Sequence, residues 1–193
     1  MIGISGAMIP GPLTLFTVSE VLKTNRFTGL KIVLGHIISE FTLIAIIFLG
    51  FQRFLDSEKF IALISFIGGA ALLAMGIVLF RNAPKMNIPQ KDAEAGFNKG
   101  LVLGGIFFSA VSPGFIIWWA TIGVSTVVRA LLYGLIGVIV LSLGHWAADV
   151  GWYWLLSYGI DKGKRYLSEK TYQRIMRLLA VLLCILGVGF IIK

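Results

Sequence analysis

Long apolar runs separated by short polar stretches make up most of the chain. Each run has about 20 residues, which is enough for a helix to cross a hydrocarbon core about 30 Å thick. Helices are expected rather than strands because a helix satisfies its own backbone hydrogen bonds where water is absent. The pattern predicts six membrane-spanning helices, at Ile2–Leu22, Gly29–Phe51, Phe60–Phe80, Gly100–Val124, Val128–Tyr158 and Ile175–Ile192.

The composition is typical of an all-α integral membrane protein and excludes an ordinary soluble domain. Of the 193 residues, 58% are hydrophobic and 13% are charged, and the mean hydropathy is +0.92. With six helices, 13 of the 17 Lys and Arg residues fall on one side of the membrane and the other 4 on the opposite side. This bias predicts a plasma-membrane protein whose first, third and fifth loops are cytoplasmic and whose termini lie outside. The net charge of +8 is therefore explained by basic residues in the cytoplasmic loops, where they can contact membrane lipid, and no nucleic-acid partner is expected.

The order of features is the same in the two halves of the chain. A polar stretch at 82–99 separates segment 1–81 from segment 100–193, and each segment has three predicted helices. Each segment has a proline-glycine break in its first helix and a Gly-His-x-x-x-acid motif in its second. The breaks are Pro10-Gly11-Pro12 and Ser112-Pro113-Gly114, and the motifs are Gly35-His36 with Glu40 and Gly144-His145 with Asp149. Because three is an odd number, the sequence predicts two inverted three-helix repeats joined by a cytoplasmic linker, the plan of many secondary transporters.

Each motif has a histidine four residues before a carboxylic acid, a spacing that puts both side chains on one helix face. Glu40 and Asp149 are the acids of this sequence that fall well inside a predicted helix, where an unpaired carboxylate is costly. Burial and neighbouring charges make proton exchange near neutral pH possible for such groups, and histidine titrates in that range. We interpret the two pairs, His36 with Glu40 and His145 with Asp149, as a central site for a proton, a cation or a substrate ammonium group. Simple structural ties between helices are the alternative.

The two breaks offer complementary chemistry. Proline removes a backbone donor and obstructs the preceding helical turn, so amides and carbonyls nearby leave the helical ladder. Such groups are tolerated at membrane depth where they line a cavity, and a helix N-terminus there attracts an anion such as a substrate carboxylate. Nearby hydroxyl groups that are able to contribute belong to Thr14, Thr17, Ser112 and Thr121.

Two kinds of substrate fit these features. Breaks that hold a carboxylate and acids that hold an ammonium group form the binding pattern of a zwitterion, which suggests an amino acid. Two histidines and two carboxylates that converge would instead hold a divalent metal ion such as Mn²⁺, Zn²⁺ or Cd²⁺. The spacing of His36, Glu40, His145 and Asp149 does not separate the two readings.

The stretches "GAMIPGPLTLF" and "TNRFTGLKIVLGH" resemble the lysine exporter family of amino-acid translocators. The resemblance extends to the number of helices, the polar central loop and the proline early in the fourth helix. It implies export of amino acids and related metabolites driven by the proton gradient, and a homodimer is compatible with it. The family's Pro-Gly-Pro motif falls on Pro10, Gly11 and Pro12. Its fourth-helix motif, often Asn-Pro, is replaced here by Ser112-Pro113-Gly114, and an acid similar to Glu40 in the basic amino-acid branch favours a cationic substrate.

No enzyme activity and no cofactor are expected. The sequence lacks the H-E-x-x-H motif of metalloproteases, the G-x-S-x-G nucleophile elbow and a phosphate-binding loop. A channel is less compatible than a transporter with a duplicated arrangement of broken helices. We therefore expect a secondary transporter that works by alternating access, with the substrate and protons as its small-molecule partners.

Overall fold

The computed structural model describes residues 11–49, 58–88 and 99–192, and this part of the chain is helical with short connections. Its elements are α2 (Pro12–Lys23), α3 (Thr28–Phe48), α5 (Glu58–Asn82), the 3₁₀ turn η1 (Ala83–Lys85), α6 (Lys99–Ala110), α7 (Pro113–Trp118), the π-helical segment η2 (Trp119–Gly123), α8 (Val124–Leu131), α9 (Gly134–Lys164) and α10 (Glu169–Ile192). Within the described residues, five helical stretches are long and apolar enough to cross a membrane. The predicted all-α membrane fold is thus confirmed.

The predicted helix boundaries need two corrections. The fourth span has the predicted break, since α6 stops before Ser112 and a new helix begins at Pro113, but this helix continues through η2 and α8 to Leu131 and does not end at Val124. The fifth span begins at Gly134 and not at the predicted Val128, because the turn after α8 leads into Gly134, whose φ of +66° suits a residue without a side chain. The first predicted span is described only from Gly11 onward, as the short helix α2, and Pro10 lies outside the described residues.

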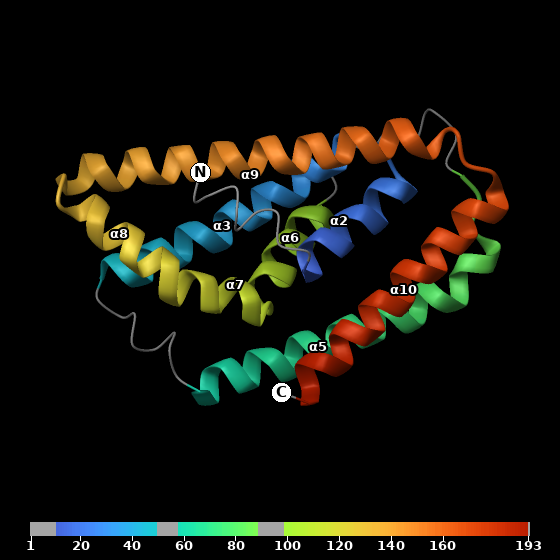
Figure 1. Cartoon of the computed structure of the whole chain (residues 1–193), viewed down its shortest axis with the longest axis horizontal. Helices are drawn as coiled ribbons and strands as arrows, with labels where there is room; N and C mark the ends of the chain where they lie inside the picture. Colours follow the sequence, from blue (N-terminus) through green and yellow to red (C-terminus); the bar gives the residue numbers. More distant parts are fainter. Residues whose placement is uncertain (1–10, 50–57, 89–98, 193) are drawn as a thin grey trace.

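The bundle has two sides and a middle part, which can be followed in Figure 1. α5 and α10 run antiparallel along one side and pack against each other over much of their length, while α9 runs along the opposite side. Between them lie α2, α3, α6 and α7, with α3 in contact with both α6 and α9. The connections from α2 to α3 and from α9 to α10 lie at one end of the bundle, and the turn between α8 and α9 lies at the other.

A close crossing of α3 and α6 sets the position of the central residues. A Cβ atom on Gly35 would come within 2.0 Å of the carbonyl oxygen of Val102, and one on Gly105 within 2.1 Å of the carbonyl oxygen of Ile32. Only glycine permits the two backbones to approach this closely, as at many helix contacts in membranes. The crossing brings the next residue of α3, His36, beside the following turn of α6.

The outer surface of the bundle is apolar. Large side chains more than half exposed occur on several helices, including Phe41 on α3, Phe66 on α5, Leu143 on α9 and Ile185 on α10. Buried polar side chains, in contrast, concentrate on α3 and α9, which contact each other. Apolar residues outside and polar residues inside are the arrangement expected of a helical bundle in lipid.

Candidate functional site

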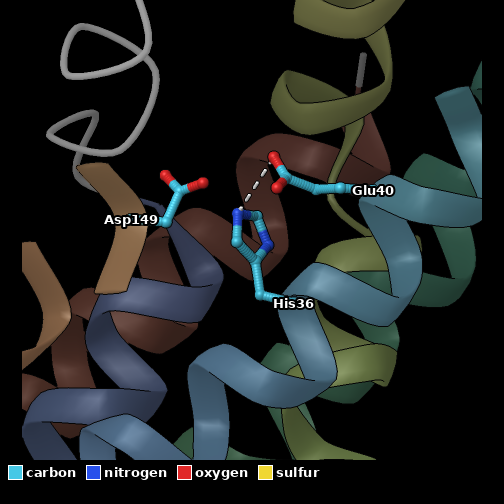
Figure 2. A group of neighbouring side chains, drawn as sticks. All are labelled: His36, Glu40 and Asp149. Carbon is cyan, nitrogen blue, oxygen red and sulfur yellow. Dashed lines mark ion pairs between the residues drawn. The ribbon is translucent and has the colours of Figure 1, made fainter. Parts of the chain in front are cut away.

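The four predicted ionisable residues meet at one buried place. His36 and Glu40 project from α3, and His145 and Asp149 project from α9. The exposed fraction is 9% or less for each of these side chains, and only 1% for the two acids. Figure 2 shows His36 and Glu40 on α3 with Asp149 facing them from α9. The structure therefore brings together the residues that the two sequence motifs single out.

The two pairs are joined to each other across α3 and α9. The shortest contact crosses between the helices, where His145 Nε2 donates a hydrogen bond to Glu40 Oε1 at 2.8 Å. The contacts within each helix are longer, at 3.4 Å from His36 Nε2 to Glu40 Oε1 and 3.6 Å from His145 Nε2 to Asp149 Oδ2. Glu40 thus lies between two histidines, and all four groups form one cluster.

Ser109 on α6 determines which ring nitrogen of neutral His36 is protonated. The Ser109 hydroxyl donates to the Gly105 carbonyl at 2.7 Å, so toward His36 Nδ1, 2.8 Å away, it accepts a hydrogen bond. The hydrogen of a neutral His36 is then on Nδ1, and its Nε2 is an acceptor that faces the carboxyl group of Glu40. The contact between His36 Nε2 and Glu40 becomes favourable when an additional proton resides on either group. Ser109 was not singled out in the sequence because a serine in an apolar helix usually bonds its own backbone.

Aromatic rings enclose both histidines. The ring of Trp118 stacks on that of His145, with centroids 5.3 Å apart, and Trp119 meets the same ring edge to face at 5.4 Å. Phe115 and Tyr153 contact His36 at centroid distances of 5.2 and 6.1 Å. Such faces stabilise a cationic ring, so this environment tolerates protonated histidine.

The π-helical segment η2 accounts for the position of the two tryptophans. Trp119 lies directly over Gly123, where a Cβ atom would come within 2.4 Å of Trp119 Cε3. The wider turn of η2, together with the absence of a side chain at Gly123, therefore makes room for the Trp119 indole between the helices. Segments of this kind are frequent at functional sites.

A cavity of about 690 Å³ joins this cluster to the helix breaks. Both carboxylates, both histidines and Ser109 line it. The residues that begin the helices after the breaks line it as well, namely Gly11 and Pro12 of the first and Ser112, Pro113 and Gly114 of the second. Ser112 is the N-cap of α7 and accepts a hydrogen bond from the Phe115 amide at 3.4 Å.

The other predicted hydroxyl groups differ in their roles. Thr14 lines the cavity and hydrogen-bonds the Tyr153 side chain. Thr17 and Thr121 instead donate to carbonyls of their own helices, those of Leu13 and Ile117, at 2.8 Å each. Neither of these two threonines lines the cavity. Of the four hydroxyl groups predicted from the sequence, those of Thr14 and Ser112 therefore belong to the candidate site.

Several polar atoms in the cluster have no hydrogen-bond partner among the described residues. These include Glu40 Oε2 and Asp149 Oδ2, both buried. One ligand atom each from His36, Glu40 and Asp149 also lies within 4.8 Å of the others, a spacing that suits a metal ion. The carboxyl groups of Glu40 and Asp149 also interact with each other, so a proton or another cation bound between them would provide the partner that buried polar atoms normally have.

Comparison with known proteins agrees with the predicted family. A family model described as LysE type translocator matches residues 4–193. No curated protein and no solved structure matches the chain. The family match spans almost the whole length and fits the apolar, all-helical fold with its helix breaks. The chain therefore belongs to the LysE type translocators, a family of multi-pass membrane transporters of amino acids and other small solutes.

Proposed function

We propose that this protein exports an amino acid in exchange for protons, by alternating access around the central cavity. The observation that carries this proposal is the lining of the cavity, which combines two helix beginnings with two buried carboxyl groups. The first kind of group favours an anion and the second a cation. A zwitterion presents both charges at once.

The ammonium group of the substrate is proposed to bind at Glu40 and Asp149. Each acid has a buried carboxylate oxygen without a partner among the described residues, and both side chains line the cavity. The substrate carboxylate would lie toward Gly11, at the N-terminus of α2, and Ser112. The aromatic and aliphatic lining that includes Phe108, Trp118 and Leu186 leaves space for the substrate side chain.

Proton coupling is proposed to follow from competition at the same cluster. The contact between His36 and Glu40 is favourable with an additional proton, and a substrate ammonium group would require the same carboxylate. Binding of the amino acid then favours release of a proton, and release of the amino acid favours its return. This exclusive use of one site by two ligands is the condition for exchange transport.

The helix contacts support the predicted inverted repeat of segments 1–81 and 100–193, joined by linker 82–99. Under a twofold relation, α2 corresponds to the helix that starts at α7, α3 to α9, and α5 to α10. The contact between α2 and α9 then corresponds to the contact between α8 and α3. The contact between α2 and α10 corresponds in the same way to the contact between α7 and α5. Gly69 on α5 and Gly187 on α10 approach each other's carbonyls in the same way, with Cβ distances of 2.6 and 2.7 Å.

A divalent metal ion is the second candidate substrate. The three ligand atoms of His36, Glu40 and Asp149 within 4.8 Å of one another favour it, and imidazole with carboxylate suits Mn²⁺, Zn²⁺ and Cd²⁺. The large apolar part of the cavity is unnecessary for an ion, which is why we place the amino acid first.

Calorimetry on the purified protein separates the two candidates. Basic and neutral amino acids are titrated beside Mn²⁺, Zn²⁺ and Cd²⁺, and each ligand that binds is tested again on Glu40→Gln. Glu20→Gln is the matched control, because Glu20 pairs with Lys23 at 2.6 Å on α2 and does not line the cavity. Amino-acid binding that Glu40→Gln abolishes and Glu20→Gln retains supports the proposal. Metal binding with the same dependence, and no amino-acid signal, makes the second candidate correct.

A further inference from the structure

The buried face of α9 has a continuous line of polar residues that extends beyond the central cluster. Starting from His145, a polar side chain recurs every four residues, a spacing of about 6 Å along the helix axis. Its members and their exposed fractions are His145 (9%), Asp149 (1%), Tyr153 (3%), Ser157 (0%) and Asp161 (6%). The opposite face of the helix has exposed apolar residues such as Trp154 and Leu155. A helix needs no such polar line for packing alone.

The cavity covers only the first part of this line. Tyr153 is among its lining residues, but Ser157 and Asp161 are not. On α5 and α10 the lining comes from Glu58, Ile61, Leu186 and neighbouring residues, at the beginning of the one helix and the end of the other. The cavity therefore extends from the cluster toward the end of the bundle where α8 turns into α9. The line on α9 continues toward the opposite end (Figure 1).

At that opposite end, two side chains fasten the C-terminus of α2. Lys164 Nζ, only 4% exposed, donates to the carbonyl oxygens of Val21 at 3.0 Å and Thr24 at 2.5 Å. The last carbonyls of a helix lack partners within the helix and attract a cation, which explains why this lysine is held there. The Tyr172 hydroxyl on α10 donates to the Leu22 carbonyl at 3.2 Å.

Charged groups complete this contact. Asp161 on α9 holds Lys164 by an ion pair of 2.9 Å and also lies 3.6 Å from the half-exposed Arg165. On α2, Glu20 pairs with Lys23. The charges at this end of the bundle are thus arranged so that one buried cation, that of Lys164, bridges α9 and α2.

Two buried hydroxyl groups, one on α9 and one on α2, have no hydrogen-bond partner among the described residues. Ser157 Oγ lies against α3, where a Cβ atom on Gly29 would come within 1.9 Å of it, and its hydroxyl has no hydrogen bond. Ser19 Oγ on α2 is in the same condition. A buried hydroxyl without a partner is costly, and that cost disappears once water reaches it. The contact between α2 and α9 is therefore closed to water in this conformation, and the buried hydroxyl groups would gain hydrogen bonds if water entered.

We infer that the face of α9 from Tyr153 to Asp161 is the second half of the transport path, closed in this conformation, with Lys164 as the latch that closes it. The first half is the cavity. When Lys164 releases the carbonyls of Val21 and Thr24, α2 and α9 separate, and water reaches Ser157 and Ser19. The inference rests on the proposed alternating access, but it requires neither a particular substrate nor proton coupling.

Thiol labelling from each side of the membrane tests this inference. Cys184 is first replaced by Ala, and Ser157→Cys is then treated with a membrane-impermeant, water-soluble maleimide in right-side-out and inside-out vesicles. With Lys164 present, we expect slow labelling from both sides. Lys164→Met keeps an unbranched side chain of similar length but removes its charge. In this variant, labelling is expected to become at least about 10-fold faster from the side on which the turn between α9 and α10 lies.

Two matched positions control for accessibility. Leu155→Cys lies at similar depth on the lipid-facing side of α9 and should remain unlabelled in both backgrounds. Ser65→Cys lines the cavity and should be labelled from the opposite side, with or without the latch. If Lys164→Met does not fold, Tyr172→Phe removes the other contact to α2 and should act in the same direction, and Ser19→Cys provides a second reporter.

The inference is overturned if neither Lys164→Met nor Tyr172→Phe accelerates labelling of Ser157→Cys or Ser19→Cys, or if the faster labelling comes from the side that reaches Ser65→Cys. Labelling is measured without substrate, so its outcome is independent of the binding experiment on Glu40. Amino-acid binding together with unchanged labelling contradicts the path alone. Accelerated labelling without amino-acid binding contradicts the proposed substrate alone.

Discussion

His145 on α9 donates a hydrogen bond of 2.8 Å to Glu40 on α3, and this bond joins residues that are 105 positions apart. It links the two halves of the chain through buried ionisable groups. Since Glu40 also lies 3.4 Å from His36, a proton gained or lost at one group changes the interactions of the others. A substrate that binds any member of this cluster therefore acts on all of them.

Removal of both acids is expected to abolish transport driven by a pH gradient. The double variant Glu40→Gln, Asp149→Asn keeps the shapes of the side chains but removes both charges and the exchangeable protons. Hydrogen bonds to charged groups contribute about 1.5–3 kcal/mol, which corresponds to a loss of about 10-fold or more in affinity. Uptake into proteoliposomes measures this effect, with Glu169→Gln as the control, because Glu169 is exposed at the start of α10 and does not line the cavity. Full pH-driven transport by the double variant would rule out a role of these acids in coupling.

Ser109→Ala is expected to weaken the fold locally and to alter the state of His36. The variant leaves His36 Nδ1 without the acceptor that lies 2.8 Å away, and an unsatisfied buried donor costs about 1–3 kcal/mol. Thermal unfolding in detergent measures the loss. Ser142→Ala is the matched control, because Ser142 is a buried serine of α9 that bonds only the Val138 carbonyl of its own helix among the described residues. Equal effects of the two variants would contradict the role given to Ser109.

Gly35→Ala is expected to disrupt the crossing of α3 and α6. The added methyl group would come within 2.0 Å of the Val102 carbonyl oxygen, so the two helices must move apart and His36 must leave Ser109. Unfolding at lower temperature and loss of ligand binding are the expected results. Gly144→Ala, in the other His motif, brings the new methyl group within 4 Å of no atom from another part of the described chain and should be neutral or slightly stabilising, by less than about 1 kcal/mol. A stable Gly35→Ala that binds ligand normally would show that the crossing is not needed for the site.

The orientation predicted from the basic residues can be measured at two highly exposed positions. Tyr166 follows α9 and is 85% exposed, and Leu132 follows α8 and is 83% exposed. In a Cys184→Ala background, Tyr166→Cys should react with an impermeant maleimide only from the cytoplasmic side and Leu132→Cys only from outside. The reverse result would invert the predicted topology, whereas reaction of both from the same side would contradict the membrane-spanning role of α9.

The sequence was sufficient for the helical class, for the family and for the residues of the cluster. Glu40 and Asp149 are recognisable because an acid in an apolar helix has few roles other than a functional or paired one. The bond between His145 and Glu40 was not predictable, because spacing within one helix says nothing about which helix faces it. Likewise, the turn before Gly134 lies in an apolar run that hydropathy reads as continuous, so only the backbone conformation reveals it.

Ser109 and the π-helical segment show a second limit. A serine gives the same sequence signal whether it bonds its own helix or a histidine on another one, and Ser109 does both. The position of Trp118 and Trp119 against His145 depends on the widened turn over Gly123, for which the sequence has no specific pattern. Both features arise from packing between helices and not from local preference.

Release of protons on substrate binding tests the central claim most directly. Calorimetric titration of the wild-type protein with the amino acid that binds best, repeated in buffers of different ionisation enthalpy, gives the number of protons exchanged per substrate. We expect proton release in the wild type, whereas Glu40→Gln, which should no longer bind the amino acid, should give no binding heat in any buffer. An amino acid that binds with full affinity and no proton release, in the pH range where transport operates, would contradict competition of substrate and proton for one cluster.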